Sequence, residues 1–103
     1  MTLYIDTTDF NKITFAIEES GKIIRRSYKV DPRQSHQTLQ KFDEFLKSKK
    51  LKVESIKKIV VNKGPGSFTG TRVGVAHAKA LGFALNVPVM FLSKEKFAKS
   101  FSG

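Results

Sequence analysis

The amino-acid sequence predicts a single α/β domain in which helices pack on a mixed five-stranded sheet, in the order β-β-β-α-β-α-β followed by a short helix. Three observations predict this class. Short apolar stretches with strand spacing open the chain, a stripe with helical spacing follows, and two further apolar runs flank a long second helical stretch. Because the chain has 103 residues, we expect one lobe rather than two lobes around a deep cleft.

The first third of the chain predicts three consecutive antiparallel strands. Leu3–Ile5 is an apolar run that polar residues 6–9 close, and Lys12–Glu18 alternates between apolar and polar residues. Residues 19–22 have the composition of a hairpin turn. Ile23–Val30 predicts the third strand, which a following aspartate and proline end.

The rest of the chain predicts two units of strand and helix. A stripe of leucine and phenylalanine predicts an amphipathic first helix, and a run of isoleucine and valine predicts a buried strand after it. The expected elements are a helix from a cap at Ser35 to about Lys50, a strand Ile56–Asn62, a helix from about Gly70 to Asn86, a strand Val87–Leu92 and a last helical turn or two in Ser93–Phe101.

A glycine-rich loop precedes the second helix, and Ser67 or Thr69 can cap that helix. Free N–H groups at a helix start can hold an anion. However, a phosphate-binding P-loop needs Gly-Lys-Ser/Thr, and a dinucleotide fingerprint needs a third glycine at Thr69. The loop alone is therefore weak evidence for a nucleotide. The motif residues are Gly64, Pro65, Gly66, Ser67, Phe68, Thr69, Gly70 and Arg72.

Small residues form two rows along the second helix at i, i+4 spacing. The first row is Gly70, Gly74, Ala78 and Gly82, and the second is Ala76, Ala80 and Ala84. A helix that is apolar nearly all round is covered on more than one side. Either a second protein lies against this helix, or its own domain covers it; the sequence leaves both interpretations open.

The segment from Gly64 to Ala76, the alanine-rich helix and Val87-Pro88-Val89 together strongly resemble the TsaB (YeaZ) family. Residues 3–8, residues 32–36 and the order of the segments agree with it. The resemblance covers the whole chain but only the N-terminal half of a typical member, so the second lobe is expected to be absent. It implies the actin-like ATPase (ribonuclease H-like) fold.

The resemblance also implies a function. Family members support threonylcarbamoyl transfer to adenosine 37 of tRNAs that read codons beginning with A. The related subunit TsaD performs the transfer, TsaE is an ATPase partner, and threonylcarbamoyl-AMP is the donor. By this resemblance the chain is a non-catalytic scaffold without a cofactor. It forms a heterodimer with a TsaD-like subunit or a homodimer when alone, and it meets tRNA through the complex.

The family docks through the two helices of its N-terminal domain. Carried over by position, this surface comprises the helix Leu39–Leu46 and the helix Gly70–Leu85, which carries the small-residue rows described above. The expected partner interface consists of Leu39, Phe42, Phe45, Leu46, Val73, Gly74, His77, Ala78, Leu81 and Gly82.

Few residues of the chain suit metal or phosphate chemistry. The chain has no cysteine, and its two histidines are isolated from each other. We expect His36 at the surface and His77 in a buried hydrogen bond or a subunit contact, with no metal at either. Asp6 matches the first phosphate-loop aspartate of the actin-like fold, but no glycine follows in that turn, so a turn-forming role is expected.

The chain is strongly basic, with 19 Lys and Arg against 9 Asp and Glu and a net charge of +10. Such a charge favours polyanions. Lys47, Lys49, Lys50 and Lys52, with Lys57, Lys58 and Lys63 nearby, predict a basic patch that helps to hold tRNA; a merely solvated surface explains it equally well.

The sequence leaves two other functions open. One is a nucleotide-dependent kinase or hydrolase of the actin-like superfamily, and the other is a basic, stand-alone tRNA-binding module. No apolar run is long enough to span a membrane, and no signal-peptide pattern opens the sequence, so we expect a cytoplasmic protein without a membrane partner.

Overall fold

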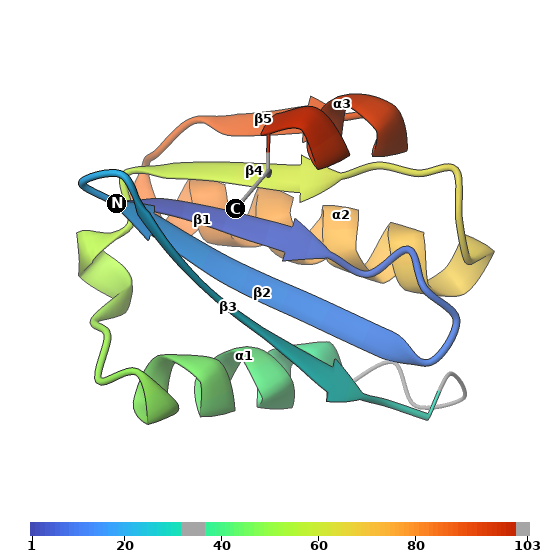
Figure 1. The fold of residues 1–103 in the computed structure, drawn as a ribbon, viewed down its shortest axis with the longest axis horizontal. Coiled ribbons are helices and arrows are strands. Elements are labelled where there is room, and N and C mark those ends of the chain that lie inside the picture. Colours follow the sequence, from blue (N-terminus) through green and yellow to red (C-terminus); the bar gives the residue numbers. More distant parts are fainter. Residues whose placement is uncertain (32–36, 101–103) are drawn as a thin grey trace.

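The computed structural model describes residues 1–31 and 37–100, and the predicted fold class is confirmed. Strands and helices follow one another along the chain in the predicted order (Figure 1). The elements are β1 (Thr2–Asp6), β2 (Lys12–Glu19), β3 (Lys22–Lys29), α1 (Gln37–Ser48), a short 3-10 helix (Val53–Ser55), β4 (Lys58–Asn62), α2 (Phe68–Leu85), β5 (Val89–Leu92) and α3 (Lys94–Ser100).

The five strands form one mixed sheet in the order β3-β2-β1-β4-β5. The central strand β1 pairs antiparallel with β2 and parallel with β4, and β4 pairs parallel with β5. Leu3 lies opposite Ile17 on one side and Ile59 on the other, so three apolar side chains point to the same face.

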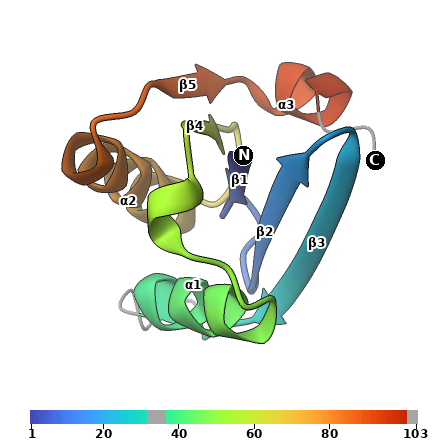
Figure 2. The same cartoon turned by 90° about the vertical axis from the view of Figure 1, so that its left-hand side faces the viewer.

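Helices cover both faces of the sheet: α1 and α2 lie on one face and α3 lies on the other (Figure 2). The alternation of side chains along β1 divides the interior accordingly, because Leu3 and Ile5 face α1 and α2 whereas Tyr4 packs with Phe97 of α3. The main core contains Leu3, Ile5, Ile13, Phe15, Ile17, Phe42, Phe45, Ile56, Ile59, Val61 and Ala78.

The ends of α2 follow local chemistry. The Gly70 N–H donates to Ser67 Oγ at 3.4 Å, so Ser67 rather than Thr69 is the N-cap. The helix ends at Asn86, whose φ of 56° is left-handed, a conformation that asparagine tolerates. The expected cap at Ser35 and the expected end at Phe101 lie outside the described residues.

Candidate functional site

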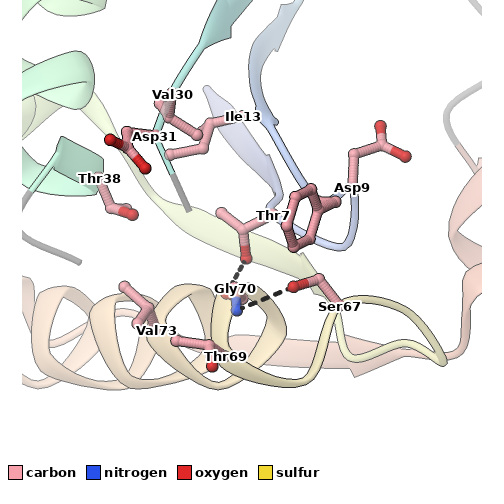
Figure 3. Close-up of a pocket in the computed structure, with 11 residues that line it drawn as sticks. Thr7, Asp9, Ile13, Val30, Asp31, Thr38, Ser67, Thr69, Gly70 and Val73 are labelled. Carbon is pink, nitrogen blue, oxygen red and sulfur yellow. Dashed lines mark hydrogen bonds between the residues drawn. The ribbon is translucent and has the colours of Figure 1, made fainter. Parts of the chain in front are cut away.

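The glycine motif joins the start of α2 to the turn after β1. The Ser67 N–H donates to the Thr8 carbonyl oxygen at 2.7 Å. The Thr7 hydroxyl donates to the Gly70 carbonyl oxygen at 2.6 Å, and Figure 3 shows this second bond. Thr7 and Thr8 are 2% and 3% exposed, so both bonds have one buried partner. The motif is therefore a joint between two elements that are far apart in the sequence.

This joint needs glycine because its neighbours leave no room for a Cβ. A Cβ on Gly66 would lie 2.5 Å from Thr8 Cβ, and one on Gly70 would lie 2.6 Å from the Thr7 carbonyl oxygen. A Cβ on Gly74 would overlap Thr7 Oγ1. Thr7 and Thr8 were not predicted from the sequence, because a contact across about sixty residues leaves no local pattern.

The other end of the motif is fixed to β4 and α3. Asn62, at the end of β4, accepts a hydrogen bond at 2.9 Å from the Gly64 N–H through its side-chain oxygen. The Gly64 carbonyl oxygen accepts from the Lys94 N–H at 2.8 Å. Gly64 has a φ of 97°, which favours glycine, and its peptide bond to Pro65 is cis. Both ends of the loop are thus held by the fold itself.

The cavity beside the motif is small. It has a volume of about 40 Å³, room for about three water molecules, and Figure 3 shows its lining. Its lining comes from the β1–β2 turn, the ends of β3 and α1, and the start of α2: Thr7, Asp9, Phe10, Ile13, Val30, Asp31, Thr38, Ser67, Thr69, Gly70 and Val73.

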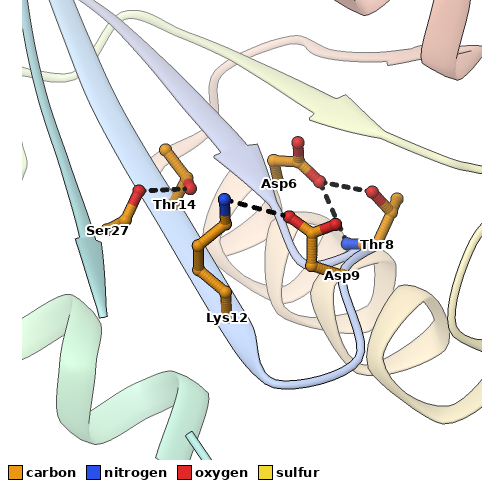
Figure 4. A network of polar contacts seen from close by, with 6 residues as sticks. All are labelled: Asp6, Thr8, Asp9, Lys12, Thr14 and Ser27. Atoms are coloured by element: carbon orange, nitrogen blue, oxygen red, sulfur yellow. Dashed lines mark hydrogen bonds and ion pairs between the residues drawn. The ribbon is translucent and has the colours of Figure 1, made fainter. Parts of the chain in front are cut away.

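Asp6 forms a turn, as the sequence predicts. Its Oδ1 accepts hydrogen bonds from the Thr8 N–H at 3.0 Å and from the Thr8 hydroxyl at 2.7 Å (Figure 4). Asp9 pairs with Lys12 at 3.4 Å. Both carboxylates border a hollow of about 580 Å³ on the α3 face of the sheet, yet each is held by a neighbour in its own turn.

Half of the expected partner interface is buried inside this domain. Phe42, Phe45, Gly74, Ala78 and Gly82 are all buried, so the domain itself covers these five expected interface residues. The physical reason is that the first row of small residues faces the sheet. Gly74 lies against Thr7, directly after β1, and Gly82 lies so close to β5 that a Cβ there would overlap a valine side chain.

The second row of small residues faces outward. Ala76, Ala80 and Ala84 are exposed, and Phe83 beside them is 91% exposed. From the expected interface Leu39 is 63% exposed. We call this set of five exposed residues the outer stripe: Ala76, Ala80, Phe83 and Ala84 of α2 and Leu39 of α1. The other expected interface residues, Leu46, Val73, His77 and Leu81, are partly buried near it.

His77 lies at the contact between α1 and α2. Its ring meets the ring of Phe42 edge-on, with 5.0 Å between the centroids. Its buried Nδ1 has no hydrogen-bond partner among the described residues, so this atom does not make the expected hydrogen bond. Burial lowers the pKa of His77 because it disfavours the charged imidazolium. His36 lies outside the described residues.

We expect His77 to make the domain less stable in mild acid. In the unfolded chain it takes up a proton near its ordinary pKa of about 6.5, whereas the folded chain resists protonation. The free energy of unfolding should therefore be highest above that pH and fall below it, by at most about 1.4 kcal/mol per pH unit. Urea unfolding between neutral and acidic pH measures the slope, and His77→Gln should flatten it. An unchanged slope in the variant would assign the pH dependence to other groups.

The expected basic patch gathers at the end of α1. Lys47, Lys50 and Lys52 are exposed and Lys49 is partly buried. Lys47 pairs with Asp43 at 2.9 Å, which offsets part of the charge. Lys63, which was grouped with this patch, follows the opposite end of β4 from Lys58, so that grouping was wrong. Contact of the patch with tRNA stays a prediction.

The described part of the chain contains neither a cluster of metal-ligating side chains nor a helix that could span a membrane. Residues 1–31 and 37–100 hold no group of three or more His, Cys, Asp or Glu side chains placed to bind a metal ion. Within the same ranges no helix combines the length and apolar character that crossing a membrane requires.

Comparison with known proteins places the chain in a family. The model of the family TsaD, tRNA N6-adenosine threonylcarbamoyltransferase, matches residues 29–96. The chain is also 31% identical over 91 residues to the tRNA threonylcarbamoyladenosine biosynthesis protein TsaB of Bacillus subtilis, an alignment that covers 88% of this chain and 40% of the relative.

Solved structures agree with this placement. YeaZ from Pseudomonas aeruginosa superposes with a TM-score of 0.78 at 25% identity, over 89% of this chain and 44% of YeaZ. RuvC from T. thermophilus, in complex with a Holliday junction substrate, superposes with a TM-score of 0.63 at 10% identity, over 99% of this chain and 69% of RuvC, and shows the ribonuclease H-like fold alone.

The chain spans less than half the length of its TsaB and YeaZ relatives. Its match nevertheless includes α1, the glycine motif, α2 and β5. The chain belongs to the TsaD family, and within it to the TsaB (YeaZ) proteins.

Proposed function

We propose that this domain is a non-catalytic scaffold in tRNA threonylcarbamoyladenosine (t6A) biosynthesis, which docks onto a TsaD-like threonylcarbamoyltransferase through α1 and α2. The outer stripe is the observation that carries this proposal. Three alanines and an almost fully exposed phenylalanine follow one side of α2, and an exposed leucine lies on α1. Exposed apolar surface of this kind is typical of protein interfaces.

Small side chains suit a helix as partner. Helices pack with their axes about 8–10 Å apart, and the closest approaches need small residues at the contact. Ala76, Ala80 and Ala84 supply such a surface, and Phe83 supplies a large side chain to bury in the partner. In the chain alone the same stripe would join two copies, so homodimer and heterodimer would compete for it.

A non-catalytic role agrees with the chemistry near the glycine motif. The Asp6 carboxylate accepts two hydrogen bonds from Thr8, and the start of α2 is joined to Thr7 and Thr8 in the turn after β1. We therefore assign catalysis to the TsaD-like partner and propose that tRNA and a TsaE-like ATPase meet this domain within the assembled complex.

Replacing Ala80 with glutamate tests the docking surface. A carboxylate buried without a partner at the interface should weaken association with the TsaD-like protein about a hundredfold. Ala98→Glu is the matched control, because Ala98 is an exposed helical alanine on α3. Both variants are co-expressed with the TsaD-like protein of the same organism, then compared by pull-down and by tRNA threonylcarbamoylation.

Under the proposal only Ala80→Glu loses the partner and the modification activity, while Ala98→Glu keeps both. Equal association of the two variants would exclude the outer stripe as the docking surface. Modification activity in the purified chain without a partner would exclude the non-catalytic assignment.

A further inference from the structure

A second unassigned surface lies on the flank of α2 that faces the edge strand β5. Two hollows of about 340 and 280 Å³ meet there, since both are lined by Lys63, Thr71 and Arg72. Lys79 borders the larger one and reaches towards β5, with its Nζ 5.7 Å from the ring centroid of Phe91. We call the surface around Lys63, Arg72 and Lys79 the cationic groove.

The charge of this groove is of one sign. Its lining includes three cationic side chains, and no carboxylate lines either hollow within the described ranges. By contrast, two carboxylates border the hollow on the α3 face, and Asp43 pairs with Lys47 in the patch at the end of α1. A groove whose charged side chains are all cationic concentrates anions from solution.

An exposed aromatic ring stands at one end of the groove. Phe68 is 74% exposed, although it lies in the first turn of α2. The Arg72 guanidinium lies 5.1 Å from its ring centroid, a cation–π contact that holds the ring beside the charged side chains. Cations beside an exposed ring are the combination that binds single-stranded nucleic acid, because cations hold the phosphates while a base stacks on the ring.

We infer that the cationic groove binds single-stranded RNA, with the phosphodiester backbone against Lys63, Arg72 and Lys79 and one base stacked on Phe68. An acidic protein segment would use the cations but would leave the phenylalanine without a role. At 100° per residue Arg72 and Lys79 lie on the β5 side of α2, whereas Ala80 and Ala84 lie on the α1 side. Ala76 of the outer stripe also lines the larger hollow, so the two surfaces adjoin on α2.

The test uses the full chain alone, so it does not depend on the proposed TsaD-like partner. Binding of a short fluorescein-labelled single-stranded RNA of mixed sequence is followed by fluorescence anisotropy at several salt concentrations. The groove variant carries Lys63→Gln, Arg72→Gln and Lys79→Gln. The control variant removes the same charge from exposed lysines outside both the groove and the basic patch, through Lys22→Gln, Lys96→Gln and Lys99→Gln. Phe68→Leu tests stacking, and thermal unfolding checks that each variant folds.

We expect the groove variant to bind at least about tenfold more weakly than the unaltered chain and to lower the slope of log K against log salt by about two, because about 0.7 is lost per phosphate contact to a single strand. Phe68→Leu should weaken binding about tenfold with the slope unchanged. Equal losses in groove and control variants would overturn the inference in favour of diffuse charge. An affinity of Phe68→Leu equal to that of the unaltered chain would also overturn it. The same holds if polyglutamate displaces the labelled RNA as well as unlabelled RNA does.

Discussion

Phe45→Ala is expected to lower the free energy of unfolding by about 3–5 kcal/mol, a large share of the stability of a domain of this size. Phe45 is fully buried, and its ring stacks on that of Phe15 with 5.8 Å between centroids. Truncation removes this contact and leaves a cavity between α1 and the sheet. Urea unfolding of the chain alone measures the loss.

Leu39→Ala is the control on the same helix. Leu39 is 63% exposed, so its truncation should change the free energy of unfolding by about 0.5 kcal/mol or less while weakening association with a TsaD-like partner. Together the two variants distinguish a residue of the domain core from a residue of the partner interface. A Phe45→Ala variant of normal stability that fails to bind the partner would return Phe45 to the interface and contradict its burial.

Gly74→Ala is expected to destabilise the domain by about 1–3 kcal/mol, although alanine is the better helix former by up to about 1 kcal/mol. The new methyl group would overlap the Thr7 side chain, so α2 must move away from β1 or Thr7 must give up its bond to the Gly70 carbonyl oxygen. Thermal or urea unfolding of the chain alone gives the cost.

A double-mutant cycle assigns this cost to one contact. In a Thr7→Ala background the overlapping hydroxyl is gone, so Gly74→Ala should cost clearly less than it does in the unaltered chain. An equal cost in both backgrounds would show that the clash lies elsewhere. A net stabilisation by Gly74→Ala would show that the two elements separate easily, and the glycine motif would then not be a joint.

The sequence predicted what depends on local pattern. Alternation in β2, the leucine and phenylalanine stripe of α1 and the β-branched run of β4 each follow from which face is buried, so their order and type were confirmed. Ser67 and Asp6 belong to this class, because a cap and a turn are made with residues nearby in the chain.

Contacts between residues far apart in the sequence could not be predicted from local pattern. Both rows on α2 consist of small residues, and only the positions of Thr7 and Val89 decide that the glycine row faces inward. The apolar stripe that contains Phe42 and Phe45 has the same spacing in the sequence whether the domain's own sheet or a partner covers it. Lys63 was grouped with lysines near it in the sequence, whereas the fold places it beside Arg72, nine positions later.

The central place of β1 in the sheet also bears on how the chain is made. The ribosome releases β1, β2 and β3 first, and these three antiparallel strands pair through short turns. Until β4 emerges, β1 is an open edge whose face carries Leu3 and Ile5, the kind of strand that associates with other chains. The Thr7–Gly70 bond, 63 positions apart, closes only after α2 has begun to form, so the joint marks the late step that protects this edge.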